Sequence, residues 1–312
     1  MPTGKVAPLL DPAGLYQVAA DLPDLQAPVL IQALDGFVDA GEVRELVRQH
    51  LLQSSPAQVV ARFDVDQLLD YRARRPLLTF VEDTWSAYDE PSLDVVALTD
   101  GRGTPYLLLA GPEPDIQWDR FADAVRQVIE RLGVRLTVGL NAIPMGVPHT
   151  RPIGMTAHGT RPEIVPPSEH WISTVQVPAS AGNLLEYRLG KAGHDAIGFA
   201  VHVPHYVAQM PFAPAAEALV SAVAKATGLQ LPTDELSTAA TATLQSINEQ
   251  VAGADEVAAA VAALELQYDA MLRGQGRNLL AEGATRLPTA DELGAELERF
   301  LAAQPRPGET SG

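Results

Sequence analysis

Short apolar runs alternate with amphipathic segments between residues 28 and 231, which is typical of strands that alternate with helices. Strands covered on both faces read as continuous apolar runs, whereas helices repeat apolar residues three and four positions apart. This alternation predicts an α/β core with a mostly parallel sheet and helices on both faces. The predicted strands are Val29–Leu34, Gln58–Phe63, Tyr106–Ala110, Val134–Leu140 and Asp195–Val203, and the predicted helices are Gly41–Leu52, Ile116–Leu132, Asn183–Lys191 and Ala213–Ala226.

Two β-rich excursions interrupt the alternation. Leu77–Glu82 and Leu93–Thr99 flank the polar stretch WSAYDEPS and are predicted to form a β-hairpin inserted near 77–99. Prolines crowd the segment 141–178 and disfavour helix there, so Thr150–His158 and Trp171–Val177 could form a second two-stranded excursion.

The two ends of the chain differ from this core. Residues 1–27 are rich in proline and are predicted as an N-terminal arm, with one short ordered piece around Leu15–Val18. From residue 232 to 302 no strand is expected, because two apolar stripes separated by Gly253 predict a helical hairpin. This module either covers the core as a lid or contacts another protein.

The end of the module carries one further predicted helix. Glu292–Phe300 follows Thr289, and this spacing is that of a capping box. The polar tail 303–312 is expected to be disordered.

Composition narrows the class of protein. The 312 residues are 46% hydrophobic, enough for one large domain with a smaller one appended. A net charge of −17 argues against binding to nucleic acid or to an anionic membrane, since both are polyanions. The chain has no cysteine, which excludes disulfides, thiol catalysis and cysteine-ligated metals. With no membrane-spanning apolar run and no signal-peptide pattern, a cytoplasmic location is expected.

The common catalytic motifs are missing from the sequence. The chain contains no phosphate-binding P-loop, nucleophile elbow, dinucleotide-binding glycine pattern or zinc-protease motif. The two histidines of HVPHY, His202 and His205, follow a strand without a nearby carboxylate, so a structural role is favoured over a metal site. No cofactor and no metal are therefore expected.

Three strand-end loops carry candidate site residues. In LDGFVDAG, Asp35, Asp39 and Gly41 precede a helix N-terminus that could hold an anion, although Asp39 could simply cap that helix. In GPEPDIQW, Glu113 and Asp115 could act as a base or bind a ligand hydroxyl; alternatively Asp115 caps the next helix and Trp118 packs in the core.

The third loop, NAIPMGVPHTRP, contains Asn141, His149 and Arg151. Arg151 could bind a carboxylate or phosphate through two hydrogen bonds, and His149 could titrate near neutral pH. The alternative is a rigid, proline-framed loop at a subunit contact, in which Arg151 pairs with one of the many acids. All of these residues except Gly41, which begins a predicted helix, lie at predicted strand ends and could meet in one cleft. Together with Gly41 they form the predicted ligand pocket.

The ordered segments VLIQALDGFVDAG, LLLAGPEPDIQWDRF, GLNAIPMGVPHTRP, IGFAVHVPHYVAQMPFAPAAEAL and LPTADELGAELERFL resemble the actinobacterial branch of the proteasome assembly chaperone 2 family. The resemblance implies a three-layer α/β/α core like that of purine nucleoside phosphorylases. It also implies a β-hairpin used in oligomerisation and a C-terminal helical domain over a ligand pocket. Homo-oligomers, in particular trimers, are what the resemblance suggests.

Two functional hypotheses follow. The first is a non-enzymatic assembly or interaction factor with a proteasome-related partner, which the resemblance and the missing catalytic motifs favour. Archaeal relatives dock through a C-terminal hydrophobic–Tyr–any tail, whereas this chain ends in ETSG, so docking by that route is not expected. The second is a small-molecule-binding protein or enzyme that uses the phosphorylase-like pocket.

Overall fold

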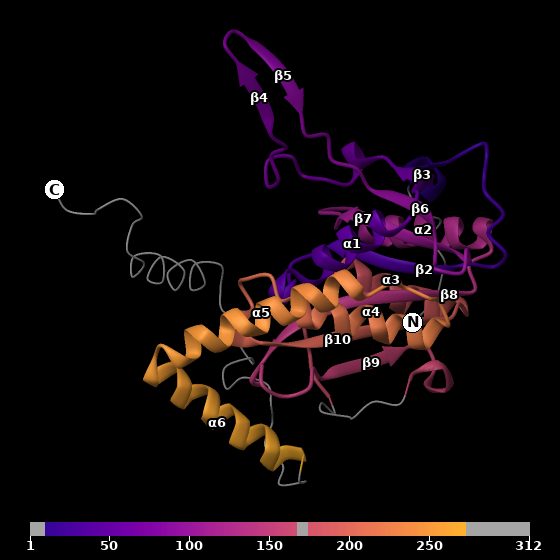
Figure 1. The fold of residues 1–312 in the computed structure, drawn as a ribbon. Coiled ribbons are helices and arrows are strands. Elements are labelled where there is room, and N and C mark those ends of the chain that lie inside the picture. The colour runs from indigo at the N-terminus through magenta and orange to yellow at the C-terminus, as the bar shows by residue number, and fades with distance from the viewer. Residues whose placement is uncertain (1–9, 167–173, 273–312) are drawn as a thin grey trace, which may run out of the picture.

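A computed structural model of the chain describes residues 10–166 and 174–272 (Figure 1). Its main sheet has eight strands in the order β1-β3-β6-β7-β2-β8-β10-β9. The central strands β7, β2, β8 and β10 are parallel, and the outer strands pair antiparallel. These strands are β1 (Tyr16–Val18), β2 (Val29–Asp35), β3 (Gln58–Phe63), β6 (Asp94–Thr99), β7 (Pro105–Pro112), β8 (Leu136–Met145), β9 (Met155–Gly159) and β10 (Ala196–Pro204).

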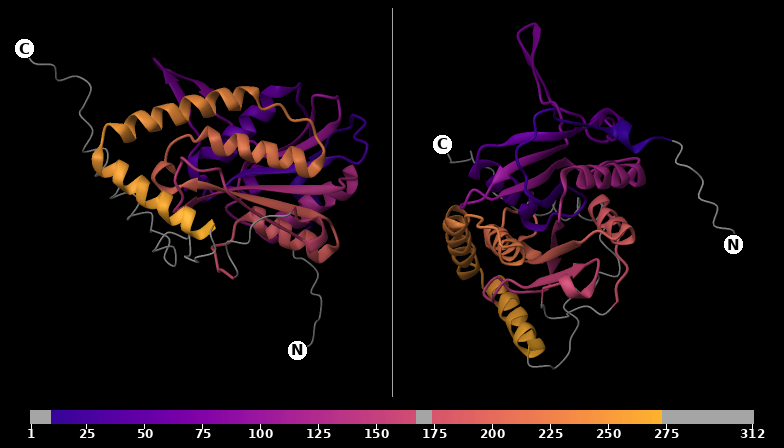
Figure 2. Two further views of the ribbon diagram at one scale, coloured as in Figure 1. Left: turned by 60° about the horizontal axis from the view of Figure 1, so that its bottom comes forward. Right: turned by 90° about the vertical axis from the view of Figure 1, so that its right-hand side faces the viewer.

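Helices cover both faces of this sheet, so the predicted α/β architecture is confirmed (Figure 2). Strand β2 shows why: Ile31 packs with one pair of helices, whereas its neighbour Leu30 packs with the other pair. Successive side chains of a strand point to opposite faces of the sheet. A continuous apolar run therefore contributes side chains to two separate hydrophobic cores, one on each face. The first pair is α1 (Val43–Ser54) and α4 (Ala213–Thr227), and the second is α2 (Trp118–Leu132) and α3 (Ala181–Ala192).

The inserted β-hairpin exists, but the prediction of its second strand is wrong. Strand β4 (Leu78–Val81) pairs with β5 (Thr84–Tyr88), which lies within the stretch taken as a polar connection. The segment predicted as the partner, Leu93–Thr99, supplies β6 between β3 and β7 of the main sheet. Burial explains the difference: five of the six residues of β6 are buried, whereas every residue of β4 and β5 is exposed.

The second predicted excursion is also corrected. The segment Thr150–His158 contributes β9, which pairs with the edge of β10 instead of forming a separate two-stranded unit. Residues 174–177 form no strand, and 167–173 lie outside the described residues.

The helical hairpin after the core is present. Helices α5 (Asp234–Ala252) and α6 (Asp255–Leu272) are separated at Gly253, as the sequence predicts, and α5 packs beside α4 (Figure 1). The predicted helix Glu292–Phe300 and the tail 303–312 lie outside the described residues. None of the helices that the structure describes is long and apolar enough to span a lipid bilayer.

Candidate functional sites

The first predicted loop is held mainly by contacts within the protein. The two carboxylate oxygens of Asp39 accept the Arg44 backbone N–H at 2.9 and 3.1 Å, so Asp39 caps the start of α1. Gly41 has a φ of +69°, and a Cβ there would lie 2.8 Å from the Cβ of Phe212. The helix-capping alternative for this loop is therefore favoured by the contacts.

Asp35 is the last residue of β2, and its side chain is more exposed to solvent than that of Asp39. One carboxylate oxygen lies 3.7 Å from Nε of Arg48, and the side chain is 44% exposed. Burial raises the pKa of Asp35 above its usual range, although the Arg48 guanidinium opposes this shift.

The loop after β7 also makes mostly internal contacts. Glu113 is 5% exposed, and its Oε1 accepts the Ala181 N–H at 2.5 Å in the first turn of α3. Asp115 accepts the Asp70 N–H at 2.8 Å and lies 2.9 Å from Nη2 of Arg74. Asp115 therefore ties this loop to the segment before the hairpin and does not cap α2, where the N-cap residue is Gln117.

Residues of the third loop form ion pairs that join the helical module to the core. Nε and Nη2 of Arg151 donate to the two carboxylate oxygens of Asp269 on α6, at 2.9 and 2.8 Å. Nη1 of Arg151 lies 3.3 Å from Glu265 on the same helix. These contacts agree with the alternative in which Arg151 pairs with acidic residues. The acidic residues belong to the same chain, whereas the alternative placed this loop at a subunit contact.

His149 forms a second contact between the core and the helical module. The Tyr206 hydroxyl accepts the His149 backbone N–H at 2.7 Å and lies 2.6 Å from Nδ1. Nε2 of His149 lies 3.1 Å from Oδ1 of Asn248 on α5. His149 thus joins the core to the helical module through hydrogen-bond contacts of its backbone and its ring.

The eight predicted residues occupy several places. Asp35, Asp39, Gly41 and Glu113 lie near the ends of β2 and β7, whereas Asp115 lies toward the hairpin. Asn141 is part of β8, which continues past the predicted end at Leu140, and His149 and Arg151 lie against α5 and α6. That all eight line one pocket stays a prediction.

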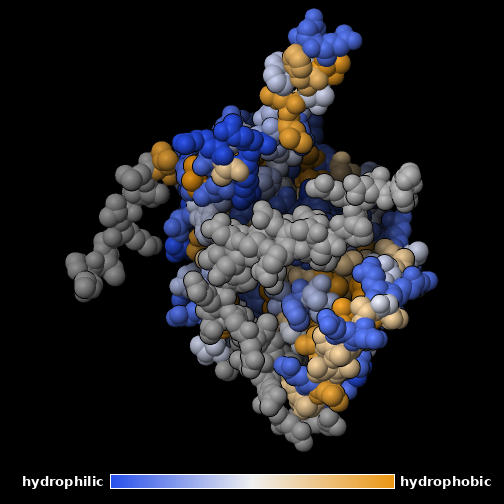
Figure 3. Space-filling view, turned by 90° about the vertical axis from the view of Figure 1, so that its left-hand side faces the viewer, coloured by the Kyte–Doolittle hydropathy of each residue, from blue (hydrophilic) through white to orange (hydrophobic). Residues whose placement is uncertain are grey.

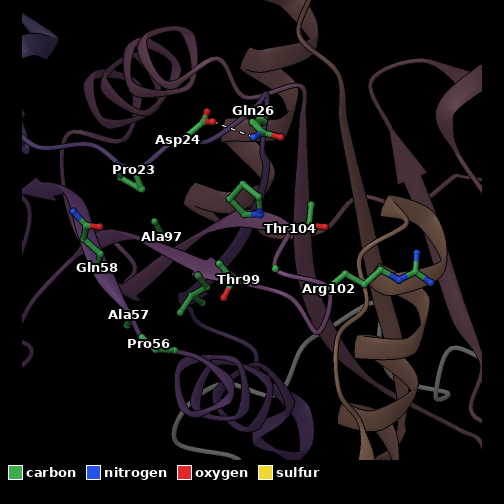
Figure 4. A pocket seen from close by; sticks show the side chains of 13 residues that line it. Pro23, Asp24, Gln26, Pro56, Ala57, Gln58, Ala97, Thr99, Arg102 and Thr104 are labelled. Carbon is green, nitrogen blue, oxygen red and sulfur yellow. Dashed lines mark hydrogen bonds between the residues drawn. The ribbon is translucent and has the colours of Figure 1, made fainter.

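A surface hollow lies elsewhere, at the opposite ends of the strands. It measures about 530 Å³ and lies where β3 begins, β6 ends and β7 begins (Figure 4). Asp24 and Gln26 face each other across its upper rim with a hydrogen bond of 3.0 Å. None of the eight predicted residues lines this hollow.

The hairpin carries an exposed apolar surface that the sequence pattern did not show. We call β4, β5 and Leu77 the arm; it projects from the body of the molecule (Figure 1). Its large apolar side chains are 50–73% exposed. They are Leu77, Leu78, Phe80, Val81, Trp85 and Tyr88. Figure 3 shows orange, hydrophobic residues along the arm below a blue, polar tip. In the sequence, the aromatic residues Trp85 and Tyr88 within the run Thr84–Tyr88 are the signal that could have indicated a strand there.

His202 of HVPHY is fully buried and makes the stability of the fold depend on pH. Its Nε2 lies 2.9 Å from the Thr156 hydroxyl, and burial lowers its pKa to about 4. The ordinary pKa of histidine is about 6.5, so between these values the unfolded chain binds a proton that the folded chain does not. The described residues contain no cluster of three potential metal-ligating side chains.

We expect the contribution of His202 to be complete above pH 6.5 and to fall by roughly 3 kcal/mol as the pH drops to about 4. Urea denaturation of the wild type and of His202→Gln at several pH values would measure it. The wild type should lose more stability than the variant across this window. Equal losses would contradict a neutral, buried His202.

Comparisons with known proteins agree with this architecture. A sequence model described as the PAC2 family matches residues 33–251. Mycobacterium tuberculosis Rv2714, of unknown function, is 50% identical with a TM-score of 0.78, over 84% of this chain and 91% of that one. A Corynebacterium glutamicum protein of unknown function is 36% identical with a TM-score of 0.79, over 83% and 98% of the two chains.

A third solved structure has a more informative name. The M. tuberculosis proteasome-assembly chaperone homologue Rv2125 is 26% identical, with a TM-score of 0.68, over 75% of this chain and 99% of that one. The search among curated proteins gave no match.

Proposed function

Because the chain belongs to the PAC2 family, we propose that it is a non-enzymatic assembly factor that acts through contacts with other proteins. The name of the similar structure Rv2125, a proteasome-assembly chaperone homologue, supports a proteasome-related partner. The observation that carries the proposal is the arm, whose apolar side chains are exposed.

The exposed arm is unfavourable for an isolated molecule. Burying one large apolar side chain contributes about 1.5–3 kcal/mol, and the arm leaves several such side chains in water. Contiguous apolar patches of this kind mark protein interaction surfaces. The rings of Phe80 and Trp85 lie 5.0 Å apart and edge to face, so the arm presents an ordered aromatic surface.

Self-association through the arm belongs to the same proposal. We propose a homo-oligomer, specifically a trimer, in which the arm contacts a second copy of the chain. We also propose a cytoplasmic location. The net charge of −17 is consistent with partners that are neither nucleic acid nor membrane. The likeness of the core to purine nucleoside phosphorylases, and a pocket beneath the helical module, also remain proposals.

Native mass spectrometry tests the proposed partner. The purified chain would be mixed with separately purified α and β subunits of a 20S proteasome. We expect a complex with one of them that Trp85→Glu removes, because this side chain is 67% exposed on the arm. Leu266→Glu, at a position 70% exposed on α6, is the matched control and should keep the complex. The absence of any complex with the wild type would overturn the proteasome link.

A further inference from the structure

The two strands of the arm carry four large side chains on one face. Residues that pair directly across an antiparallel hairpin point to the same side, and the register pairs Leu78 with Tyr88 and Phe80 with Trp85. Each of these side chains is at least 50% exposed, and the rings of Phe80 and Trp85 are in edge-to-face contact. The two other pairs combine smaller side chains and lie on the opposite face. The arm therefore presents one apolar, largely aromatic face.

An apolar groove lies between α6 and the segment that follows β10, and we call it the α6 groove. It measures about 540 Å³. One wall is formed by the rings of His205 and Tyr206, whose centroids lie 5.5 Å apart in an edge-to-face arrangement. The other wall is a stripe of side chains on α6, of which Val257 is 44% exposed. The stripe consists of Val257, Ala260, Val261 and Leu264.

The arm and the α6 groove belong to different ends of the molecule. The arm is inserted between β3 and β6, toward one edge of the main sheet, whereas the groove adjoins the end of β10, next to the other edge. Both views in Figure 2 show the hairpin and α6 on opposite sides of the sheet. One chain therefore cannot place its arm in its own groove, and only a second molecule can bring the two surfaces together.

The two surfaces match in length. The stripe Val257–Leu264 spans about 11 Å, at 1.5 Å per helical residue. Strand β4 spans about 13 Å, at about 3.3 Å per residue. The apolar face of the arm can therefore cover the whole stripe.

The charges beside the two surfaces are opposite in sign. Arg72 and Arg75 are exposed just before the arm, in a chain with only 22 basic residues against 39 acidic ones. Asp255 and Glu256 are exposed in the first turn of α6, and Glu256 lines the groove. Complementary charges at the rim of an interface favour encounter and fix its orientation.

We propose that the apolar face of the arm binds in the α6 groove of a second copy of the chain, with Arg75 beside Glu256 of that copy. This inference rests on the proposed self-association and adds the surface that receives the arm. The contact joins two different surfaces, so each copy offers one arm and one groove. Head-to-tail contacts of this kind form a closed ring when the rotation between copies closes, and a ring of three copies leaves no arm or groove open.

Mixing two defective variants tests the contact, with mass measured by light scattering coupled to size-exclusion chromatography. Leu77→Glu/Trp85→Glu has a defective arm, and Val257→Glu has a defective groove; each alone should have the mass of one chain. Their equimolar mixture should contain a species of twice 33.2 kDa, because the intact arm of one variant enters the intact groove of the other and no further contact is possible. Val257 belongs to none of the buried clusters, so Val257→Glu should fold.

Leu266→Glu is the matched control for Val257→Glu. Leu266 is more exposed, at 70%, and lies on the same helix but does not line the groove, so its substitution should leave the mass unchanged. Arg75→Glu and Glu256→Arg should each raise the dissociation constant about tenfold, and their combination in one chain should restore it.

The outcomes separate this contact from the wider proposal. A Val257→Glu protein with the mass of the wild type, a mixture that contains only single chains, or no restoration by the combined charge reversal would each overturn the arm-in-groove contact. The role of the arm in self-association would then stand on its own test. A wild type with the mass of one chain would overturn self-association itself.

Discussion

Gly111→Ala is expected to lower the free energy of unfolding by about 3–5 kcal/mol. Gly111 lies in β7 with a φ of +133°, a backbone conformation that residues with a side chain rarely adopt. A Cβ there would lie 2.2 Å from the backbone oxygen of Ser92 and 2.8 Å from Cα of Leu93. Backbone cannot rotate aside as a flexible side chain can, so β7 or the start of β6 must move.

Gly103→Ala is the matched control for this substitution. Gly103 also has a positive φ, +78°, but a Cβ there would meet nothing within 4 Å. Gly103→Ala should therefore lower the free energy of unfolding only by the backbone strain, about 1–2 kcal/mol. Urea denaturation of both variants measures the two losses, and a Gly111→Ala protein as stable as the Gly103→Ala protein would refute the close approach of β7 to residues 92–93.

The sequence predicts the core well because its signal is local. Buried strands and amphipathic helices are recognised from neighbouring residues, and glycines at the helix ends, such as Gly193 and Gly228, mark where α3 and α4 stop. The β-hairpin was located for the same reason. The prediction of its second strand is wrong because the sequence alone does not distinguish apolar residues of an exposed strand from those of a buried strand.

The candidate sites depend on contacts that sequence spacing cannot supply. Arg151 looked like an anion-binding residue, yet its partner Asp269 lies 118 positions away on α6. Glu113 similarly meets the backbone of Ala181, 68 positions further along the chain.

The arm should hold copies of the chain together. Leu77 and Trp85 are its two most exposed large side chains, at 73% and 67%. Replacing both by glutamate places charge where an interface needs apolar surface and removes about 2–4 kcal/mol of association free energy, or roughly a 30- to 1,000-fold change in the dissociation constant. The fold itself should be unaffected, because neither side chain belongs to the buried clusters.

The most direct test is the mass of the full chain in solution, measured by light scattering coupled to size-exclusion chromatography. The wild type should have a mass that is a multiple of 33.2 kDa, three times for the proposed trimer, and Leu77→Glu/Trp85→Glu should have the mass of one chain. Leu266→Glu should behave as the wild type does. A wild type of 33.2 kDa, or a double variant that keeps the mass of the wild type, would contradict the arm as the interaction surface.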